Sequence, residues 1–157
     1  YCAIMQDMEV TWMPSYGPEM RGGTANVCVI LSDRKISSPI VTKYDTVIAL
    51  NQQSLDKFQG AVKPGGLLIY DPNGINNPPT RTDVKVCRID AINVAAKVGN
   101  SKVYNMAVMG AFLKMKPIIS FENIDKGLAK CIPARYADLI SLNKAAIVEG
   151  MNAVEEL

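Results

Sequence analysis

The chain has 157 residues, of which 48% are hydrophobic and 20% charged, a composition that excludes disordered and coiled-coil proteins. At this length we expect one compact domain spanning residues 1–157. Seventeen Lys and Arg residues face fifteen Asp and Glu residues, a formal net charge of +2, so neither nucleic acid nor an anionic membrane is an expected partner. No run of about 18 apolar residues is present, which excludes a transmembrane helix.

Histidine is absent from the sequence, which excludes Ser-His-Asp triads, Cys-His nucleophile pairs and imidazole metal ligands. The four cysteines, at positions 2, 28, 87 and 131, lie too far apart for the close pairs that hold iron–sulfur clusters or zinc. We therefore expect no cofactor to be bound by this chain alone. No signal peptide is recognisable, so a reducing, cytoplasmic setting is expected.

The first elements predicted along the chain are strands. Residues 9–13 are rich in strand formers and precede a run of turn-forming residues, 14–23. Residues 25–31 (ANVCVIL) are almost continuously apolar, a pattern typical of a strand covered on both faces.

A strand–helix–strand unit follows. Residues 46–50 and 67–70 predict two buried strands. Between them, Asn51 is placed to cap a helix over residues 52–62, which the run 63–66 (KPGG) should end. Two strands joined by one helix within about 25 residues are typical of a parallel βαβ unit.

The remainder combines one strand with several helices. A polar loop over residues 71–83 leads to a strand over 84–89 that is expected to be an edge strand or half-exposed. Helices are predicted over 90–98, 102–116 (capped by Ser101), 121–130 and 135–155. The expected fold is α/β, with an open, mainly parallel sheet, helices on both faces and a helical C-terminal end. Ligands of such sheets gather at the carboxyl ends of the strands, which favours Asn51 and the loop after residues 9–13.

Residues 15–26 (SYGPEMRGGTAN) form the most informative segment. Its glycines, Gly17, Gly22 and Gly23, allow close backbone approach and leave N–H groups available to an anion or a partner. Arg21 could pair with an anion and Glu19 could hold Arg21 in place. The alternative is a tight structural loop in which Glu19 and Arg21 pair only with each other.

This segment resembles the gamma subunit of 2-oxoacid:ferredoxin oxidoreductases, and the resemblance covers essentially the whole chain. The form YGPEMRGG at residues 16–23 is more similar to enzymes for 2-oxoglutarate and branched-chain 2-oxoacids than to the FGPERRG pattern of pyruvate enzymes. Further agreement lies in residues 45–51 (DTVIALN), Gly65-Gly66, Tyr70-Asp71, Val98-Gly99-Asn100, Asn105-Met106, Met109-Gly110 and the set Asn143, Ala145 and Gly150.

One departure concerns the start of the chain. Family members open with a strand and a Gly-rich turn that leads into a helix, and the sequence, which begins at Tyr1, has neither. We expect residues 1–8 to be the tail of that first helix and an N-terminal piece to be missing, so that any anion site here is incomplete.

The resemblance implies oxidative decarboxylation of a 2-oxoacid with coenzyme A as second substrate, giving an acyl-CoA, carbon dioxide and reduced ferredoxin. It also implies a complex with alpha and beta subunits and a ferredoxin-like delta subunit, in which those subunits hold thiamine diphosphate, magnesium and the iron–sulfur clusters. This chain would frame the active site without carrying the chemistry. The residues expected to face coenzyme A or the active site are Tyr16, Gly17, Glu19, Arg21, Gly22, Gly23 and Asn51.

Three alternatives stay open on sequence alone. The first is a free-standing nucleotide-binding protein, such as a dehydrogenase or flavodoxin-like module. The second is the small subunit of an indolepyruvate:ferredoxin oxidoreductase, and the third is a non-catalytic assembly module whose Gly-rich loop only packs against a partner.

Overall fold

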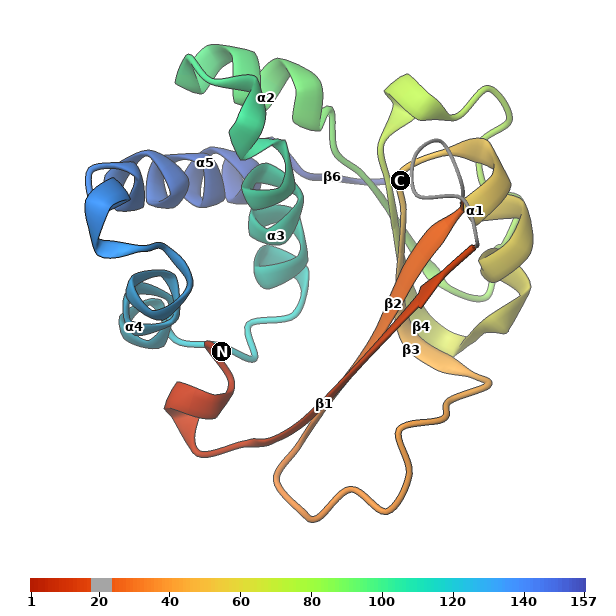
Figure 1. The fold of residues 1–157 in the computed structure, drawn as a ribbon. Coiled ribbons are helices and arrows are strands. Elements are labelled where there is room, and N and C mark those ends of the chain that lie inside the picture. The colour runs from red at the N-terminus through yellow and green to blue at the C-terminus, as the bar shows by residue number, and fades with distance from the viewer. Residues whose placement is uncertain (18–23) are drawn as a thin grey trace. The chain divides into compact units, whose positions relative to one another are not determined.

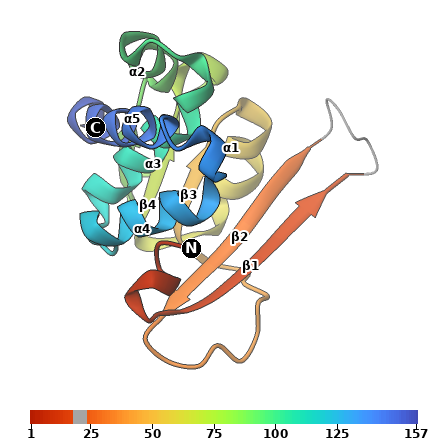
Figure 2. The same ribbon diagram turned by 60° about the vertical axis from the view of Figure 1, so that its left-hand side comes forward.

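The computed structural model describes residues 1–17 and 24–157, and the chain forms two units. The first unit consists of residues 1–41 and 119–133, and the second of residues 42–118 and 134–157. Figures 1 and 2 show the ribbon from two directions. No helix among the described residues is both long and apolar enough to cross a membrane.

The first unit contains a β-hairpin and one helix. Strand β1 (Glu9–Tyr16) pairs antiparallel with β2 (Ala25–Ser32) in a two-stranded sheet, which Figure 2 shows as a long ribbon. Helix α4 (Phe121–Cys131) packs against a 3₁₀ turn (Ile4–Gln6), and the Gln6 Oε1 atom accepts a hydrogen bond from the backbone N–H of Ser120 at 2.9 Å. α4 matches the helix predicted for this segment.

The expectation that residues 25–31 form a strand covered on both faces is wrong. In β2, exposed residues alternate with partly buried ones from Ala25 to Ile30, and the only strand paired with β2 among the described residues is β1. β1 also continues to Tyr16 rather than ending at Met13. A continuous apolar run can therefore belong to a ribbon that leaves one apolar face uncovered.

The second unit contains a four-stranded sheet in the order β3-β4-β5-β6. β3 (Tyr44–Ala49), β4 (Val62–Tyr70) and β5 (Lys85–Arg88) run parallel, and β6 (Glu155–Glu156) pairs antiparallel with β5. Helix α1 (Gln52–Phe58) connects β3 to β4. The predicted βαβ unit and the open, mainly parallel sheet are confirmed.

Several predicted boundaries in this unit are wrong. α1 ends at Phe58 and continues as a 3₁₀ turn (Gln59–Ala61), and residues 63–66 belong to β4. Gly65 lies at φ 73°, and its N–H donates a hydrogen bond to the Asp83 carbonyl at 2.7 Å. The glycine therefore allows a left-handed backbone conformation within β4 and does not end the helix. β5 is half-exposed, one of the two alternatives predicted for it, and the edge alternative is wrong because β6 pairs with its outer side.

Helices cover both faces of this sheet, as predicted. Leu68 and Tyr70 point to one face and pack with Leu55 of α1. Leu67 and Ile69 point to the other face. There they pack with residues of α2 (Ala91–Val98) and α3 (Tyr104–Met115), and α5 (Leu139–Ala153) packs against both helices. Because successive side chains of β4 point to opposite faces of the sheet, this one strand contributes to two separate apolar layers.

Helices α3 and α5 approach each other at two glycines. A Cβ atom at Gly110 would clash with the carbonyl oxygen of Ile147, and one at Gly150 would clash with that of Ala107. Both glycines are buried. Each helix therefore presents a glycine to the other's backbone, and α3 packs against both α5 and α2.

Gly110→Ala and Gly150→Ala are each expected to lower the free energy of unfolding by about 2 kcal/mol, because the added methyl group must force two backbones apart. Urea denaturation of each variant measures the change. Gly60→Ala is the control, since an added Cβ atom there meets nothing within 4 Å. Equal or greater stability of the Gly110 and Gly150 variants would contradict this account, because alanine is otherwise the better helix former.

Candidate functional site

Two of the predicted site residues lie at the end of the hairpin in the first unit. Tyr16 is the last residue of β1 and is 70% exposed. The Gly17 N–H bonds to the Thr24 carbonyl at 3.2 Å, which continues the pairing of the two strands. Glu19, Arg21, Gly22 and Gly23 lie outside the described residues.

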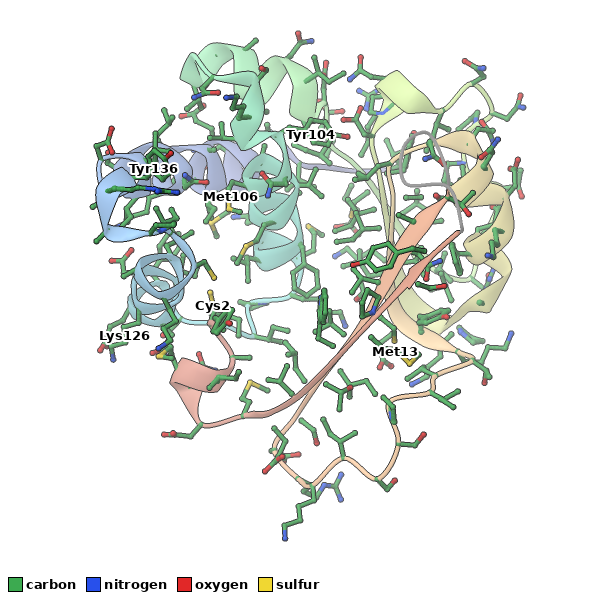
Figure 3. The ribbon with its side chains drawn as sticks, viewed as in Figure 1. Cys2, Met13, Tyr104, Met106, Lys126 and Tyr136 are labelled. Carbon is green, nitrogen blue, oxygen red and sulfur yellow. The ribbon has the colours of Figure 1, made fainter. Side chains whose placement is uncertain are left out.

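The hairpin has one apolar face. Directly opposed residues of an antiparallel pair share a face, and Trp12 lies opposite Val29 while Pro14 lies opposite Val27. Trp12, Val27 and Val29 are each at least half exposed. Figure 3 labels Met13, which belongs to the other face. Large apolar side chains gathered on one exposed face are typical of an interaction surface.

Asn51 lies in the second unit and caps α1. Its Oδ1 atom accepts a hydrogen bond from the Ser54 backbone N–H at 2.8 Å, as its position after a strand predicts. The cap therefore uses the side-chain oxygen of Asn51. The preceding residue, Leu50, lines a cavity at the same end of β3.

A hydrogen-bond network crosses the carboxyl ends of β4 and β5. The Asp71 Oδ1 atom accepts hydrogen bonds from the backbone N–H and from Nδ2 of Asn73, both at 2.8 Å. The same Asn73 amide donates to the Asp90 Oδ1 atom at 2.8 Å. Asp90 in turn caps α2 through the Asn93 N–H. Asn73 thus joins the carboxylates that follow the two neighbouring strands.

The network changes the titration of Asp90. Burial alone would raise the pKa of this carboxyl, but hydrogen bonds from Asn73 and Asn93 hold its pKa below the ordinary value. The charged form of Asp90 is therefore the one that the folded protein stabilises.

A cavity of about 290 Å³ lies beside this network. Its lining combines polar and apolar groups from the strand ends and from the starts of α2 and α3: Leu50, Asp71, Asn73, Gly74, Ile92, Ala95, Ser101 and Tyr104. Gly74 is required here because a Cβ atom would clash with the Leu50 carbonyl oxygen. The loop after β4 is thereby held close to the end of β3.

Asp71 is the buried polar residue of this cavity. It is 1% exposed, and its Oδ2 atom has no hydrogen-bond partner among the described residues. Tyr104, labelled in Figure 3 at the start of α3, lines the same cavity. Burial, followed by interaction with the Asp71 carboxyl, raises the pKa of the Tyr104 phenol. Tyr104 therefore keeps its proton at neutral pH.

The sequence prediction missed Asp71, Asp90 and Tyr104. A signal for the two carboxylates was present, because each comes directly after a predicted strand, at the edge where ligands of parallel sheets gather. No local pattern marks Tyr104, whose position depends on how α3 packs. Across residues 1–17 and 24–157, no group of three His, Cys, Asp or Glu side chains could hold a metal ion.

Asn73→Ala is expected to lower the free energy of unfolding by about 1–2 kcal/mol at pH 7, because it removes side-chain hydrogen bonds to two carboxylates. The stabilisation that Asn73 gives through Asp90 is fully present above pH 3.8, the ordinary pKa of an aspartate. It is lost as the pH falls through the lower pKa that Asp90 has in the folded protein. Urea denaturation between neutral and acidic pH measures this trend.

The control is Asn76→Ala, because the exposed Asn76 contacts Gln52 through its backbone N–H. If the Asn73 variant is less stable than the wild type by the same free energy of unfolding at neutral and at acidic pH, the role assigned to Asp90 is contradicted.

Comparison with known proteins adds a family match. The family model described as pyruvate ferredoxin/flavodoxin oxidoreductase matches residues 1–153. Ketoisovalerate oxidoreductase subunit VorA of Methanothermobacter marburgensis is 32% identical over 113 residues, 72% of this chain and 23% of VorA. The chain thus spans about a quarter of the length of this relative.

Two further matches cover most of both proteins. 2-Oxoglutarate synthase subunit KorC of Methanocaldococcus jannaschii is 29% identical over 157 residues, 99% of this chain and 82% of KorC. The crystal structure of the gamma subunit of a keto/oxoacid ferredoxin oxidoreductase from Geobacter sulfurreducens superimposes with a TM-score of 0.77 at 26% identity. This match covers 97% of the present chain and 83% of the Geobacter chain.

Proposed function

The chain belongs to the pyruvate ferredoxin/flavodoxin oxidoreductase family, and from this membership we propose that it is the gamma subunit of a ferredoxin-dependent 2-oxoacid oxidoreductase. The assembled enzyme would oxidatively decarboxylate a 2-oxoacid with coenzyme A, giving an acyl-CoA, carbon dioxide and reduced ferredoxin. The observation that carries this proposal is the near full-length match to KorC. The similarity to VorA supports 2-oxoglutarate or a branched-chain 2-oxoacid as substrate.

We propose that this chain frames the active site while other subunits carry the chemistry. The sequence has no histidine, and the described residues offer no side-chain group suited to a metal ion. The family resemblance leads us to assign thiamine diphosphate, magnesium and the iron–sulfur clusters to alpha, beta and a ferredoxin-like delta subunit. The cysteines at 2, 28, 87 and 131 are free, which supports the cytoplasmic setting.

The apolar hairpin face supports assembly with partner subunits. Trp12, Val27 and Val29 expose large apolar side chains on one side of a two-stranded ribbon. Such a ribbon is marginally stable in water by itself, and a partner that covers this face would remove its apolar area from water. We assign this face to contact with the alpha and beta subunits.

Co-expression with alpha and beta subunits is expected to give one complex that reduces ferredoxin with 2-oxoglutarate or 2-oxoisovalerate. Val27→Lys with Val29→Lys should weaken co-purification at least tenfold, because two charges would be buried at the contact. Both positions are already half exposed, so circular dichroism should show a folded chain.

Ile40→Lys is the matched control, because Ile40 is exposed in the same unit and lies outside the hairpin. A double variant that assembles normally would contradict the assigned surface. A wild-type complex that oxidises no 2-oxoacid would overturn the proposed function.

We assign residues 16–23 to the coenzyme A side of the active site. Tyr16 and Gly17 lie where the described hairpin ends, and Glu19, Arg21, Gly22 and Gly23 follow in sequence. Exposed Tyr16 supports this assignment. For the second unit we separately propose that Asn51, at the carboxyl end of β3, faces coenzyme A through the part of its amide that the helix cap does not use.

Arg21→Ala in the assembled enzyme is expected to raise the KM for coenzyme A about tenfold or more, because a charge-assisted contact to an anion is lost. Folding and assembly should be unchanged. The control is Arg34→Ala, since the Arg34 side chain is exposed and its ion pair among the described residues is with neighbouring Asp33. An unchanged KM with an unstable complex would show that the loop is structural.

A further inference from the structure

We propose that Cys2 and Cys131 form a reversible disulfide with each other when the protein meets a small disulfide such as oxidised glutathione. The bond would tie the segment that leads into β1 to helix α4. It would form independently of the proposed function, because both cysteines lie in the first unit. Three features support it: the packing of Cys2 against α4, the place of Cys131 on that helix and the exposure of the Cys131 thiol.

Cys2 packs directly against α4. The 3₁₀ turn that follows it (Ile4–Gln6) packs against this helix. A Cβ atom at Gly127 would clash with the Cys2 Sγ atom and would lie 3.1 Å from the Cys2 Cα atom. Gly127 therefore leaves room on the surface of α4 for the Cys2 side chain, which Figure 3 shows beside this helix.

Cys131 is the last residue of α4 and lies one turn after Gly127. Residues four apart in an α-helix are neighbours on one face, and a helical side chain leans toward the N-terminus of its helix. The Cys131 thiol is thereby directed back over the turn in which Gly127 admits the Cys2 Sγ atom.

The two thiols also interact electrostatically. Burial raises the pKa of the Cys2 thiol, the amino terminus offsets part of that rise, and the charge of Cys131 adds to it. Electrostatic interactions weaken with distance and are screened in water. The effect of Cys131 on Cys2 therefore agrees with the proximity that the helix geometry gives.

The more accessible thiol starts the reaction. Both cysteines are free thiols, and Cys131 is exposed whereas Cys2 is partly buried. The Cys131 thiolate attacks one sulfur of oxidised glutathione, breaks its S–S bond and releases one glutathione thiolate, which leaves the other glutathione bonded to Cys131. The Cys2 thiolate then attacks the Cys131 sulfur and displaces the second glutathione.

This exchange is balanced and reversible. The two cysteines lose two protons and two electrons, and oxidised glutathione takes them up to become two thiols. Reduced glutathione reverses both steps, so the disulfide follows the ratio of oxidised to reduced thiols around the protein. Disulfides that form in reducing compartments are usually of this transient kind.

Treatment of the full chain with excess oxidised glutathione tests the proposal. Trypsin cleaves after Lys and Arg, which places the four cysteines in separate peptides. Mass spectrometry is expected to find peptide 1–21 joined to peptide 131–135 as the main disulfide-linked product, and dithiothreitol should release it. The same link should form at least tenfold more slowly in urea, because unfolding separates two residues that are far apart in sequence. Glutathione retained on Cys131 without the link, or equal rates in urea, would overturn the proposal.

Serine variants identify the two partners. Cys2→Ser is expected to stop with glutathione on Cys131, because the second thiol is missing. Cys131→Ser, a change at an exposed position, should keep its circular dichroism spectrum and leave Cys2 unlinked. Cys28→Ser is the matched control, because Cys28 lies on β2 opposite Met13, and it should form the link as the wild type does. A folded Cys28→Ser chain without the link would overturn the proposal. Equally ready pairing of Cys131 with Cys28 in the Cys2→Ser chain would overturn it too.

Discussion

The close approach of α3 and α5 determines most of the second unit. Each helix places a glycine against a backbone carbonyl of the other, at Gly110 and at Gly150, so the distance between the two helices is set by backbone atoms. α2 packs against both helices, and the apolar residues of α3 cover one face of the sheet. The start of α3 carries Tyr104 to the cavity, and the position of the Tyr104 phenol beside Asp71 therefore depends on a contact elsewhere in the helical layer.

Elements that are determined by a few neighbouring residues were predicted correctly from the sequence. Asn51 follows an apolar strand and caps a helix in the structure, and Gly99 ends α2 in the left-handed conformation at φ 91°. The parallel βαβ unit and the helices on both faces of the sheet follow from alternating apolar runs and helical segments. Such features depend on a few adjacent residues, so one sequence is enough to find them.

Other features depend on partners distant in sequence. Residues 25–31 carry the pattern of a strand buried on both faces, yet β2 has one strand neighbour among the described residues. Residues 63–66 look like a helix stop, yet the Gly65 N–H bonds to Asp83 and the segment joins β4. Of the candidate site, the hairpin end and Asn51 were anticipated. The Asp71 cavity was missed because it requires the ends of two strands, α2 and α3 together.

The sheet of the second unit has two unlike edges. At one edge, β6 contributes two glutamates, and Glu155 and Glu156 form ion pairs with Arg88 and Lys85 of β5. A two-residue strand with charged side chains is a poor template for further pairing. At the other edge, β3 has six residues and no strand on its outer side among the described residues. Growth of this sheet by an added strand is therefore directional, with β3 as the edge that can accept one.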